Sequence, residues 1–456
     1  METTGEEKLS QKVAEHILQR LSEGGQPPEI GVGHINVGTD NYLQVLESEY
    51  FQGILKGGSS FKLVEGYFGG GKTHFLFCVR ELAWKHEFVA SFVELSPAEC
   101  PYDDPLKVYK AVAKNLCPPP GAGEFPSPGG LTDLLDDFLE DIVQIQGRKA
   151  AELFVRKTAK RVPCESHSFR QAIYSYMKAE LAGDEEIAAR IGAWLQGEPV
   201  SAAMVKDLGV FETMSKANAF AMLRSLSQVL AGLGIPGLVL LFDEVDRNMS
   251  VGMRRTRAIG DNLRQVIDLC GRAHLPNTLF LYAVPPEFMR NVVPEYPALY
   301  QRLKSPLPFS KRSPQAPIID LQSLDMAPVD LLNILGRKIL YVFEKARGVE
   351  FDQELQNRNI ASLARECVDR EFELNHRRLF VKVWTDALFR QIEDGQEDIS
   401  KLSHEDEIVG AMEELVSKGE VWEDMDDEDE LEGDELEKMD ENSGRASRKG
   451  GPRSIH

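Results

Sequence analysis

Eight consecutive residues, 66–73, carry the strongest chemical signal in the sequence. They read Gly-Tyr-Phe-Gly-Gly-Gly-Lys-Thr and match the pattern G-x-x-x-x-G-K-[ST] at every fixed position. Glycines let a turn aim its N–H groups at phosphate oxygens, and a helix that starts there offers the positive end of its dipole to the same anion. The motif predicts that the phosphates of ATP bind at Gly66, Gly69, Gly70, Gly71, Lys72, Thr73 and His74.

Two residues of this loop have separate chemical roles. Lys72 would reach the β- and γ-phosphates, and the hydroxyl of Thr73 would bind Mg²⁺. A glycine-rich turn with an incidental lysine is the alternative. The loop, however, follows an expected strand, 61–65, and opens an expected helix, 73–85, which is the context a phosphate-binding loop requires.

A pair of carboxylates forms the second chemical feature. Asp243 and Glu244 follow residues 238–242, an unbroken apolar run typical of a strand buried on both faces. Ligands bind at the carboxyl ends of such strands. We expect Asp243 to join Thr73 in holding Mg²⁺, and Glu244 to polarise the attacking water while Lys72 assists catalysis. Seen alone, an acidic pair after a strand is often a solvated turn.

These residues need a parallel sheet to position them, and the surrounding sequence predicts one. Strand 61–65, the loop, its helix and a strand at 88–95 form a βαβ pattern. About 100 residues of helical sequence, 131–233, come before the next strand and are too long for one crossover, so we expect an inserted helical subdomain. Further strands are expected at 237–242, 278–284 and 318–321.

The expected fold class is α/β, a P-loop NTPase with a parallel sheet, a large helical insertion, a helical C-terminal lid and a disordered acidic tail. The boundaries follow changes in composition and periodicity. We expect an N-terminal helical segment at 1–34, an ATPase core at 35–325 that contains the insertion at 131–233, a lid at 326–395 and the tail at 396–456.

The charge of the chain is concentrated in that tail. The 456 residues carry a formal net charge of −21, from 73 acidic and 52 basic side chains. Between residues 393 and 441 there are 23 acidic side chains and three lysines, so the rest of the chain is nearly neutral. The net charge therefore does not exclude a nucleic-acid partner.

The cysteine content and the hydropathy of the sequence favour a cytoplasmic protein without membrane contact. The six cysteines are scattered, and no apolar run approaches the ~20 residues that a membrane helix needs.

With these residues in place, the chain resembles the ATP-binding proteins of bacteriophage-exclusion (BREX) defence systems, P-loop proteins related to AAA+ and STAND ATPases. Residues 88–96, 193–199 and 261–268 resemble the second strand, the insertion and the helix after the acidic strand of that family. The resemblance covers residues 35–392. It implies ATP and Mg²⁺ as cofactors, hydrolysis, protein partners in a defence complex and a homo-oligomer.

The resemblance also assigns three arginines. Residues 296–303 resemble the segment in which AAA+ relatives such as clamp loaders carry an arginine finger, which makes Arg302 the residue that acts on a neighbouring subunit's nucleotide. Residues 375–380 resemble the start of the sensor-2 helix, where a lid arginine contacts the nucleotide; Arg377 aligns best, and Arg378 is the second candidate. Exposed basic side chains at helix ends are the alternative for all three.

One position departs from the AAA+ pattern. The fourth core strand ends in Tyr282-Ala283-Val284, without the polar sensor-1 residue expected there. Hydrolysis is therefore expected to be slow, and an interaction protein that binds ATP without cycling is one alternative. An origin-recognition-like DNA loader is another, since basic stretches at 148–161 and 254–264 suit DNA phosphates, although solvated helix faces are the more frequent reason for such stretches.

Overall fold

The computed structural model describes residues 9–96, 99–121, 124–244, 253–272, 274–369, 376–401 and 407–411, without the side chains of residues 253–256 and 401. The chain divides into two compact units, Met1–Leu402 and Ser403–His456. All elements named below belong to the first unit. Of the predicted tail, 396–456, the structure describes residues 396–401 and 407–411, and the rest lies outside the described residues.

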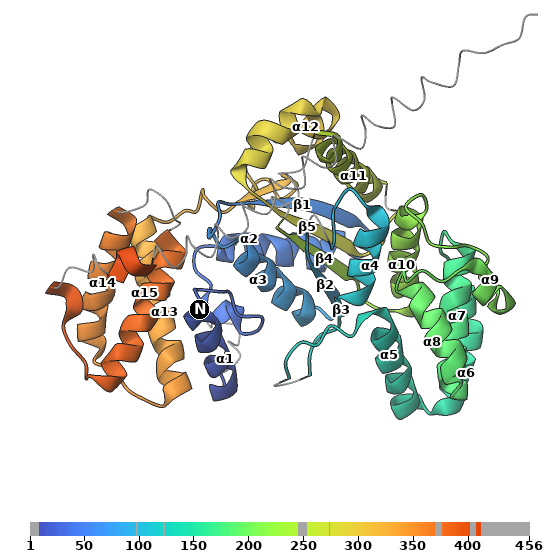
Figure 1. Ribbon diagram of the computed structural model, residues 1–456, viewed down its shortest axis with the longest axis horizontal. Coiled ribbons are helices and arrows are strands. Elements are labelled where there is room, and N and C mark those ends of the chain that lie inside the picture. The colour runs from blue at the N-terminus through green and yellow to red at the C-terminus, as the bar shows by residue number, and fades with distance from the viewer. Residues whose placement is uncertain are drawn as a thin grey trace, which may run out of the picture. The chain divides into compact units, whose positions relative to one another are not determined.

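One six-stranded sheet, ordered β3-β2-β4-β5-β1-β6, forms the centre of the first unit (Figure 1). All pairings are parallel except that of the short edge strand β3 with β2. The carboxyl ends of β1, β5 and β4 therefore meet at one edge of the sheet. The strands are β1 Ser59–Glu65, β2 Val89–Glu94, β3 Leu116–Cys117, β4 Leu238–Asp243, β5 Thr278–Val284 and β6 Ile318–Asp320.

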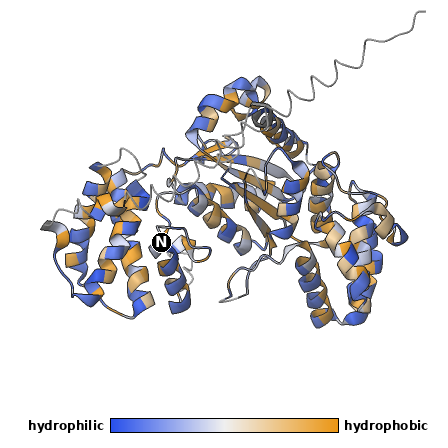
Figure 2. Ribbon diagram, in the orientation of Figure 1, coloured by the Kyte–Doolittle hydropathy of each residue, from blue (hydrophilic) through white to orange (hydrophobic). Residues whose placement is uncertain are grey.

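Side-chain alternation along β4 and β5 builds a core on each face of the sheet. Both strands are buried at every residue, which explains their unbroken apolar sequences. Val239 and Leu241 face the core shared with helix α3, Lys72–Lys85, while Leu240 and Phe242 face the core shared with α11, Met253–Gly271. Figure 2 shows the apolar strands enclosed by helices that are polar on their outer sides.

A buried lysine of β1 holds the connection that leads to β6. Lys62 is 1% exposed, and its Nζ donates to the carbonyl oxygens of Pro314 at 3.1 Å and Ala316 at 2.7 Å. The ammonium also lies over the rings of Tyr50 and Phe309, 4.7 and 4.9 Å from their centroids. Burial lowers the pKa of Lys62 to about 7. The connection is thus fixed to the middle of strand β1.

The predicted insertion is helical and is packed onto the sheet through α4, Pro105–Lys114. Asp104 caps α4 by accepting the N–H groups of Leu106 and Lys107, and Ser166 caps α7 by accepting that of Phe169. Trp194 is fully buried in the insertion core. The insertion helices are α5 Gly130–Gln146, α6 Arg148–Lys157, α7 His167–Ala182, α8 Glu185–Leu195, α9 Ala202–Val205 and α10 Ala219–Leu233.

The lid contains three helices, α13 Pro328–Arg347, α14 Gln353–Asp369 and α15 His376–Glu393. The N-terminal helix α1, Gln11–Ser22, packs on α13 and α15, so the segment 1–34 contributes to the same helical layer. Residues 40–54 form one turn and a half of α-helix, α2 Asp40–Val45, followed by a π-helix, Leu46–Ile54.

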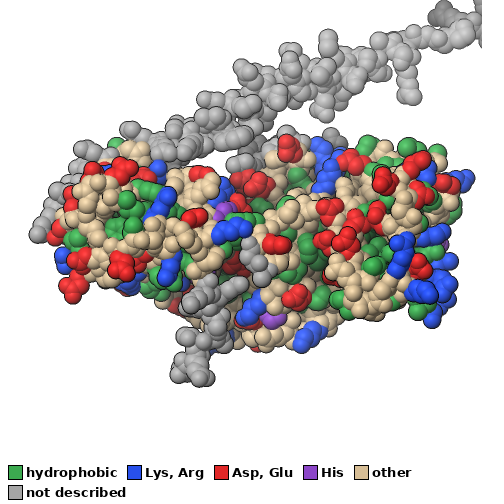
Figure 3. Space-filling view, turned by 90° about the horizontal axis from the view of Figure 1, so that it is seen from below, with side chains coloured by type: hydrophobic (Ala, Val, Ile, Leu, Met, Phe, Trp, Pro, Cys, Tyr) green, Lys and Arg blue, Asp and Glu red, His purple; other side chains and the backbone are tan. Residues whose placement is uncertain are grey.

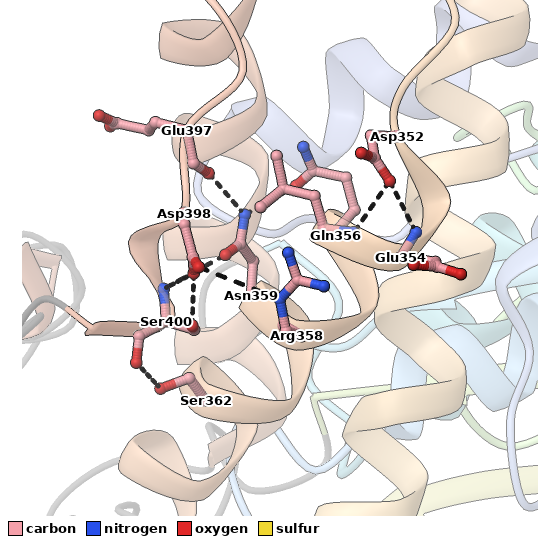
Figure 4. Close-up of polar contacts among 10 residues, drawn as sticks. Asp352, Glu354, Gln356, Arg358, Asn359, Ser362, Glu397, Asp398 and Ser400 are labelled. Atoms are coloured by element: carbon pink, nitrogen blue, oxygen red, sulfur yellow. Dashed lines mark hydrogen bonds and ion pairs between the residues drawn. The ribbon is translucent and has the colours of Figure 1, made fainter.

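Residues beyond the expected lid boundary are tied to α14 by a polar network (Figure 4). The buried Asn359 donates from Nδ2 to the carbonyl of Glu397 at 3.0 Å and accepts the N–H of Ser400 at 3.2 Å. Ser362 Oγ donates to the carbonyl of Ser400 at 3.2 Å. Asn359 Nδ2 also donates to Gln356 Oε1 at 3.1 Å, and residues 397–400 supply its remaining partners. The lid therefore extends through the 3₁₀ turn Ile399–Lys401.

Candidate functional site

The glycine loop connects β1 to α3 at the edge where the parallel strands end. Its first N–H, of Gly66, donates to the carbonyl of Val284 in β5 at 3.1 Å, which anchors the loop to the sheet. Gly69 and Gly71 adopt φ of 69° and 89°, conformations that favour glycine. At Gly70 a Cβ would lie 2.9 Å from the carbonyl oxygen of Tyr67. Backbone geometry thus favours glycine at positions 69, 70 and 71.

The lysine of the motif points back over this loop. Lys72 is 8% exposed, and its Nζ donates to the carbonyl oxygens of Gly66 at 3.0 Å and Tyr67 at 3.3 Å. The ammonium therefore lies inside the turn formed by residues 66–71. Phosphate oxygens bound in this turn would meet the lysine and the start of α3 together.

The structure brings the acidic pair next to the glycine loop, although Thr73 and Asp243 are 170 positions apart in the chain. Thr73 Oγ1 donates to Asp243 Oδ2 at 2.5 Å. The other carboxylate oxygen, Oδ1, accepts the N–H of Glu244 at 2.9 Å. A hydroxyl and a carboxylate are the hard oxygen ligands that Mg²⁺ prefers, so these residues fit the metal expected with ATP.

Glu244 has an unusual backbone. Its φ is 57°, in the left-handed region that non-glycine residues rarely adopt. Such conformations are concentrated at functional sites. The turn at Glu244 directs the chain out of the strand beside Asp243, at the edge where the glycine loop lies.

Two consecutive lid arginines reach different parts of the core. Arg377 Nη1 donates to the carbonyl of Gly70 at 2.8 Å, and its Nη2 to that of Leu321 at 3.2 Å. Arg378 Nε donates to the carbonyl of Gly24 at 3.0 Å, and its guanidinium lies 5.4 Å from the centroid of the Phe68 ring. Arg377 is therefore the arginine that contacts the backbone of the glycine loop.

His74 lies between the loop and the lid. Burial lowers the pKa of its imidazole to about 4, and the nearby Arg377 and Lys338 add to the effect. The imidazole is neutral at ordinary pH, so it can lie beside two cations without repulsion. No motif in the sequence marks Lys338, because its position depends on how α13 packs.

Lys338 also fixes the segment that precedes the sheet. Its Nζ donates to the carbonyl of Asn36 at 2.7 Å. On the α3 side, Glu81 accepts the N–H groups of Val32 at 3.1 Å and Gly33 at 3.2 Å. Residues 32–36 are thus held between α3 and the lid.

A further carboxyl group directly precedes the loop. Glu65 is the last residue of β1, and its register partner in β6 is Asp320. Burial raises the pKa of Glu65; Asp320 and Glu287 raise it further, whereas Arg290 lowers it. No motif marks this residue, because its charged neighbours come from the end of β6 and from the segment after β5.

Arg302 is placed elsewhere. It lies on α12, Pro297–Leu303, and forms a two-pronged ion pair with Asp268 of α11, Nε–Oδ1 at 2.5 Å and Nη2–Oδ2 at 2.9 Å. Its Nη1 donates to the carbonyl of Ala298 at 2.7 Å. Within one chain, Arg302 is engaged with α11 and α12 and is not joined to the glycine loop.

The position expected for a sensor-1 residue is apolar. β5 lies between β1 and β4, so its end is between the glycine loop and the acidic pair. Ala283 and Val284 are fully buried there. The hydroxyl of Tyr282 lies 2.5 Å from that of Tyr102, in the core on the face opposite α3.

A groove of about 560 Å³ opens beside Thr73. It runs between α3, the end of β2 and α4, so the side of the loop that carries Thr73 is accessible from solvent. Its lining includes Phe77, Arg80, Glu94, Lys107 and Lys110.

Comparison with known families assigns the chain. The family described as BREX system ATP-binding protein BrxC/D matches residues 9–404. The protein belongs to this BREX family. The match includes α1, the whole sheet, the insertion and the lid, and it is longer at both ends than the resemblance expected from the sequence. No curated protein and no solved structure matches the chain.

The family is one of ATP-binding proteins, which agrees with the glycine loop of this BREX member. In the part of the BREX protein that the structure describes, no helix is both long and apolar enough to cross a membrane.

Proposed function

We propose that this BREX-family protein is a P-loop ATPase, AAA+ or STAND-like, that binds ATP with Mg²⁺ at residues 66–74, hydrolyses it and moves its lid in doing so. The lid movement would act on partner proteins of a phage-defence assembly. The observation that carries the proposal is the hydrogen bond from Arg377 of the lid to the carbonyl of Gly70 in the loop, 2.8 Å long. This hydrogen bond joins the glycine loop, which would bind phosphate, to the lid, which would move.

Two cations of the site are held by carbonyl oxygens that phosphate would replace. Lys72 donates to Gly66 and Tyr67, and Arg377 to Gly70 and Leu321. Phosphate oxygens carry negative charge and accept stronger hydrogen bonds than carbonyls do. Bound ATP would therefore draw both side chains toward its phosphates, and Arg377 would bring the first turn of α15 with it.

The water-activating group is Glu244. Thr73 and Asp243 would hold Mg²⁺, and the charge of the ion would offset the charge that develops on the phosphates. Glu244 follows Asp243 directly, so its carboxylate would accept a proton from water attacking the γ-phosphate. After cleavage, the loss of the γ-phosphate would release Arg377 to the loop carbonyl again.

An oligomer would complete the site with Arg302. A trans-acting role requires the ion pair with Asp268 to open, because the pair occupies Nε and Nη2 of the guanidinium. We infer that assembly with a neighbouring copy supplies the competing anion, the γ-phosphate held by that copy.

A protein that binds ATP without hydrolysing it is the second candidate. It is favoured by the apolar end of β5, where Ala283 and Val284 offer no side-chain donor to a water molecule. The two candidates differ in one measurable property, which is turnover that depends on Glu244.

The experiment compares ATP binding and phosphate release in the parent protein and in Glu244→Gln. Removal of a general base lowers turnover by about 10²–10⁴-fold, while ATP affinity should stay unchanged. Glu87→Gln is the matched control, because Glu87 is exposed and has a similar φ of 60°. Equal turnover in Glu244→Gln and Glu87→Gln would remove Glu244 from the mechanism, and no turnover in any of the three would favour the second candidate.

A further inference from the structure

A dense group of cations lies on the helical insertion, away from the glycine loop in the sequence. Six lysines and arginines occur within 14 residues that form α6 and the following 3₁₀ turn, Ala159–Arg161, and all six are exposed. Figure 3 shows lysine and arginine side chains gathered over the insertion, at the right-hand end of that view. We call these residues the α6 basic face: Arg148, Lys149, Arg156, Lys157, Lys160 and Arg161.

Most of this charge is not neutralised by the protein. Arg148 pairs with Glu152 at 3.6 Å. Among the residues that the structure describes, the other five cations of the α6 basic face have no acidic partner within ion-pair distance. Lys110 and Lys114 on α4, by contrast, both bind Glu198, at 2.8 and 2.5 Å. In a protein with more acidic than basic residues, five unpaired neighbouring cations indicate a surface for an external polyanion.

The α7 helix extends the same surface. Lys160 Nζ lies 5.3 Å from the centroid of the Tyr174 ring, and Arg148 donates to the carbonyl of Leu181. The exposed Lys178 is four residues after Tyr174 and three before Leu181, so it lies on the side of α7 that borders the α6 basic face. The positive surface is therefore two helices wide.

An anionic membrane is the less suitable partner. Amphipathic helices bind membranes by inserting an apolar face below the headgroups. The apolar face of α6 is already used, because Ala151 and Val155 are buried and Phe154 packs against Phe138. Of the apolar side chains of α6, Leu153 alone is exposed, at 40%. One exposed leucine is too small an apolar face for insertion, so contact through α6 would be mainly electrostatic.

We propose that the α6 basic face binds the phosphate backbone of double-stranded DNA without reading its sequence. At 1.5 Å per α-helical residue and 2.0 Å per 3₁₀ residue, the face is about 20 Å long. A duplex presents one negative charge per ~1.7 Å of its axis, about 12 charges over that length. One strand alone presents a phosphate every ~3.4 Å, about six over that length, which matches the six cations of the α6 basic face. The inference concerns residues outside the ATP site and is independent of the proposed hydrolysis.

The test measures binding of a fluorescently labelled DNA duplex to the full chain at several salt concentrations. Five phosphate contacts give a slope of about −4.5 for log K against log [salt]. The triple variant Lys149→Ala/Arg156→Ala/Lys157→Ala should reduce that slope to about −1.8 and weaken binding about 500-fold at 0.1 M salt. All three side chains are exposed, so the variant should keep its circular dichroism spectrum and its ATP affinity.

The control is a triple variant with the same change in net charge at exposed lysines elsewhere, Lys56→Ala/Lys304→Ala/Lys345→Ala. It should retain the parent's affinity and slope. The proposal is overturned if both triple variants bind DNA alike, or if the parent does not bind the duplex at 50 mM salt. Binding of phosphatidylserine vesicles, but not of DNA, through the α6 basic face would also overturn it. Loss of ATP hydrolysis alone would leave these DNA measurements unaffected.

Discussion

Replacement of Arg377 by alanine offers the most direct test of how the lid senses nucleotide. The guanidinium spans two carbonyl oxygens, those of Gly70 in the loop and Leu321 after β6. We expect Arg377→Ala to loosen the lid and to weaken ATP binding more than ADP binding. The matched control is Arg378→Ala, which removes the same charge from the next residue but leaves both contacts of Arg377 in place.

The size of the effect follows from an exchange of acceptors. A hydrogen bond from a charged donor to a carbonyl contributes about 1.5 kcal/mol, and one to a charged acceptor about 3 kcal/mol. ATP binding replaces the carbonyl of Gly70 by a γ-phosphate oxygen, so Arg377 adds the difference, about 1.5 kcal/mol. That value corresponds to about a tenfold loss of ATP affinity in Arg377→Ala. ADP lacks the γ-phosphate, and its affinity should change by less than about threefold.

Two assays separate the contributions. Titration calorimetry with ATP and ADP gives the change in nucleotide discrimination, and hydrogen exchange reports the opening of α15, His376–Glu393. The variant should exchange faster in α15 without nucleotide, and ATP should no longer protect that helix. Equal loss of affinity for ATP and ADP, or the same result in Arg378→Ala, would refute a γ-phosphate-dependent contact.

Three further outcomes follow from other contacts. Asp243→Asn should still bind ATP in the absence of metal, but its ATP affinity should no longer depend on the Mg²⁺ concentration, because the carboxylate that faces Thr73 is removed. A Mg²⁺ titration of ATP affinity that matches the parent protein would contradict this. For Lys62, burial lowers the pKa from 10.5 to about 7, so the unfolded chain binds more protons than the folded one between these values. The free energy of unfolding should therefore rise with pH from 7 toward 10, by up to about 1.4 kcal/mol per pH unit, and Lys62→Met should abolish that dependence in urea titrations. Trp194→Ala should lower the free energy of unfolding by about 3–5 kcal/mol, measured by circular dichroism, yet leave ATP affinity unchanged because Trp194 lies in the insertion core.

Local chemistry explains the parts of the fold that the sequence predicted. Strand β5 has the expected bounds, 278–284, since an apolar run between Asn277 and Pro285 leaves no alternative for a doubly buried strand. The sequence predicted the glycine loop equally well, because backbone geometry favours glycine at those positions. The short edge strand β3, Leu116–Cys117, was missed, since two residues carry no periodic pattern.

Contacts between distant elements could not be predicted. The sequence left Arg377 and Arg378 as alternatives, and only the packing of α15 on the core directs the first to Gly70 and the second to Gly24. The pairing of Arg302 with Asp268 depends likewise on the contact of α12 with α11. Such pairs are determined by tertiary packing, which a single sequence does not reveal.

The position of β1 in the sheet also affects how the protein is made. Both neighbours of β1, the strands β5 and β6, follow it by about 210 residues or more in the chain. At about 5–20 residues per second, a ribosome needs about 10–40 s to produce the first of them. During that time the apolar strand that leads into the glycine loop has no partner on either edge. Soluble yield should therefore depend on chaperones or slow growth more than on the stability of the finished protein.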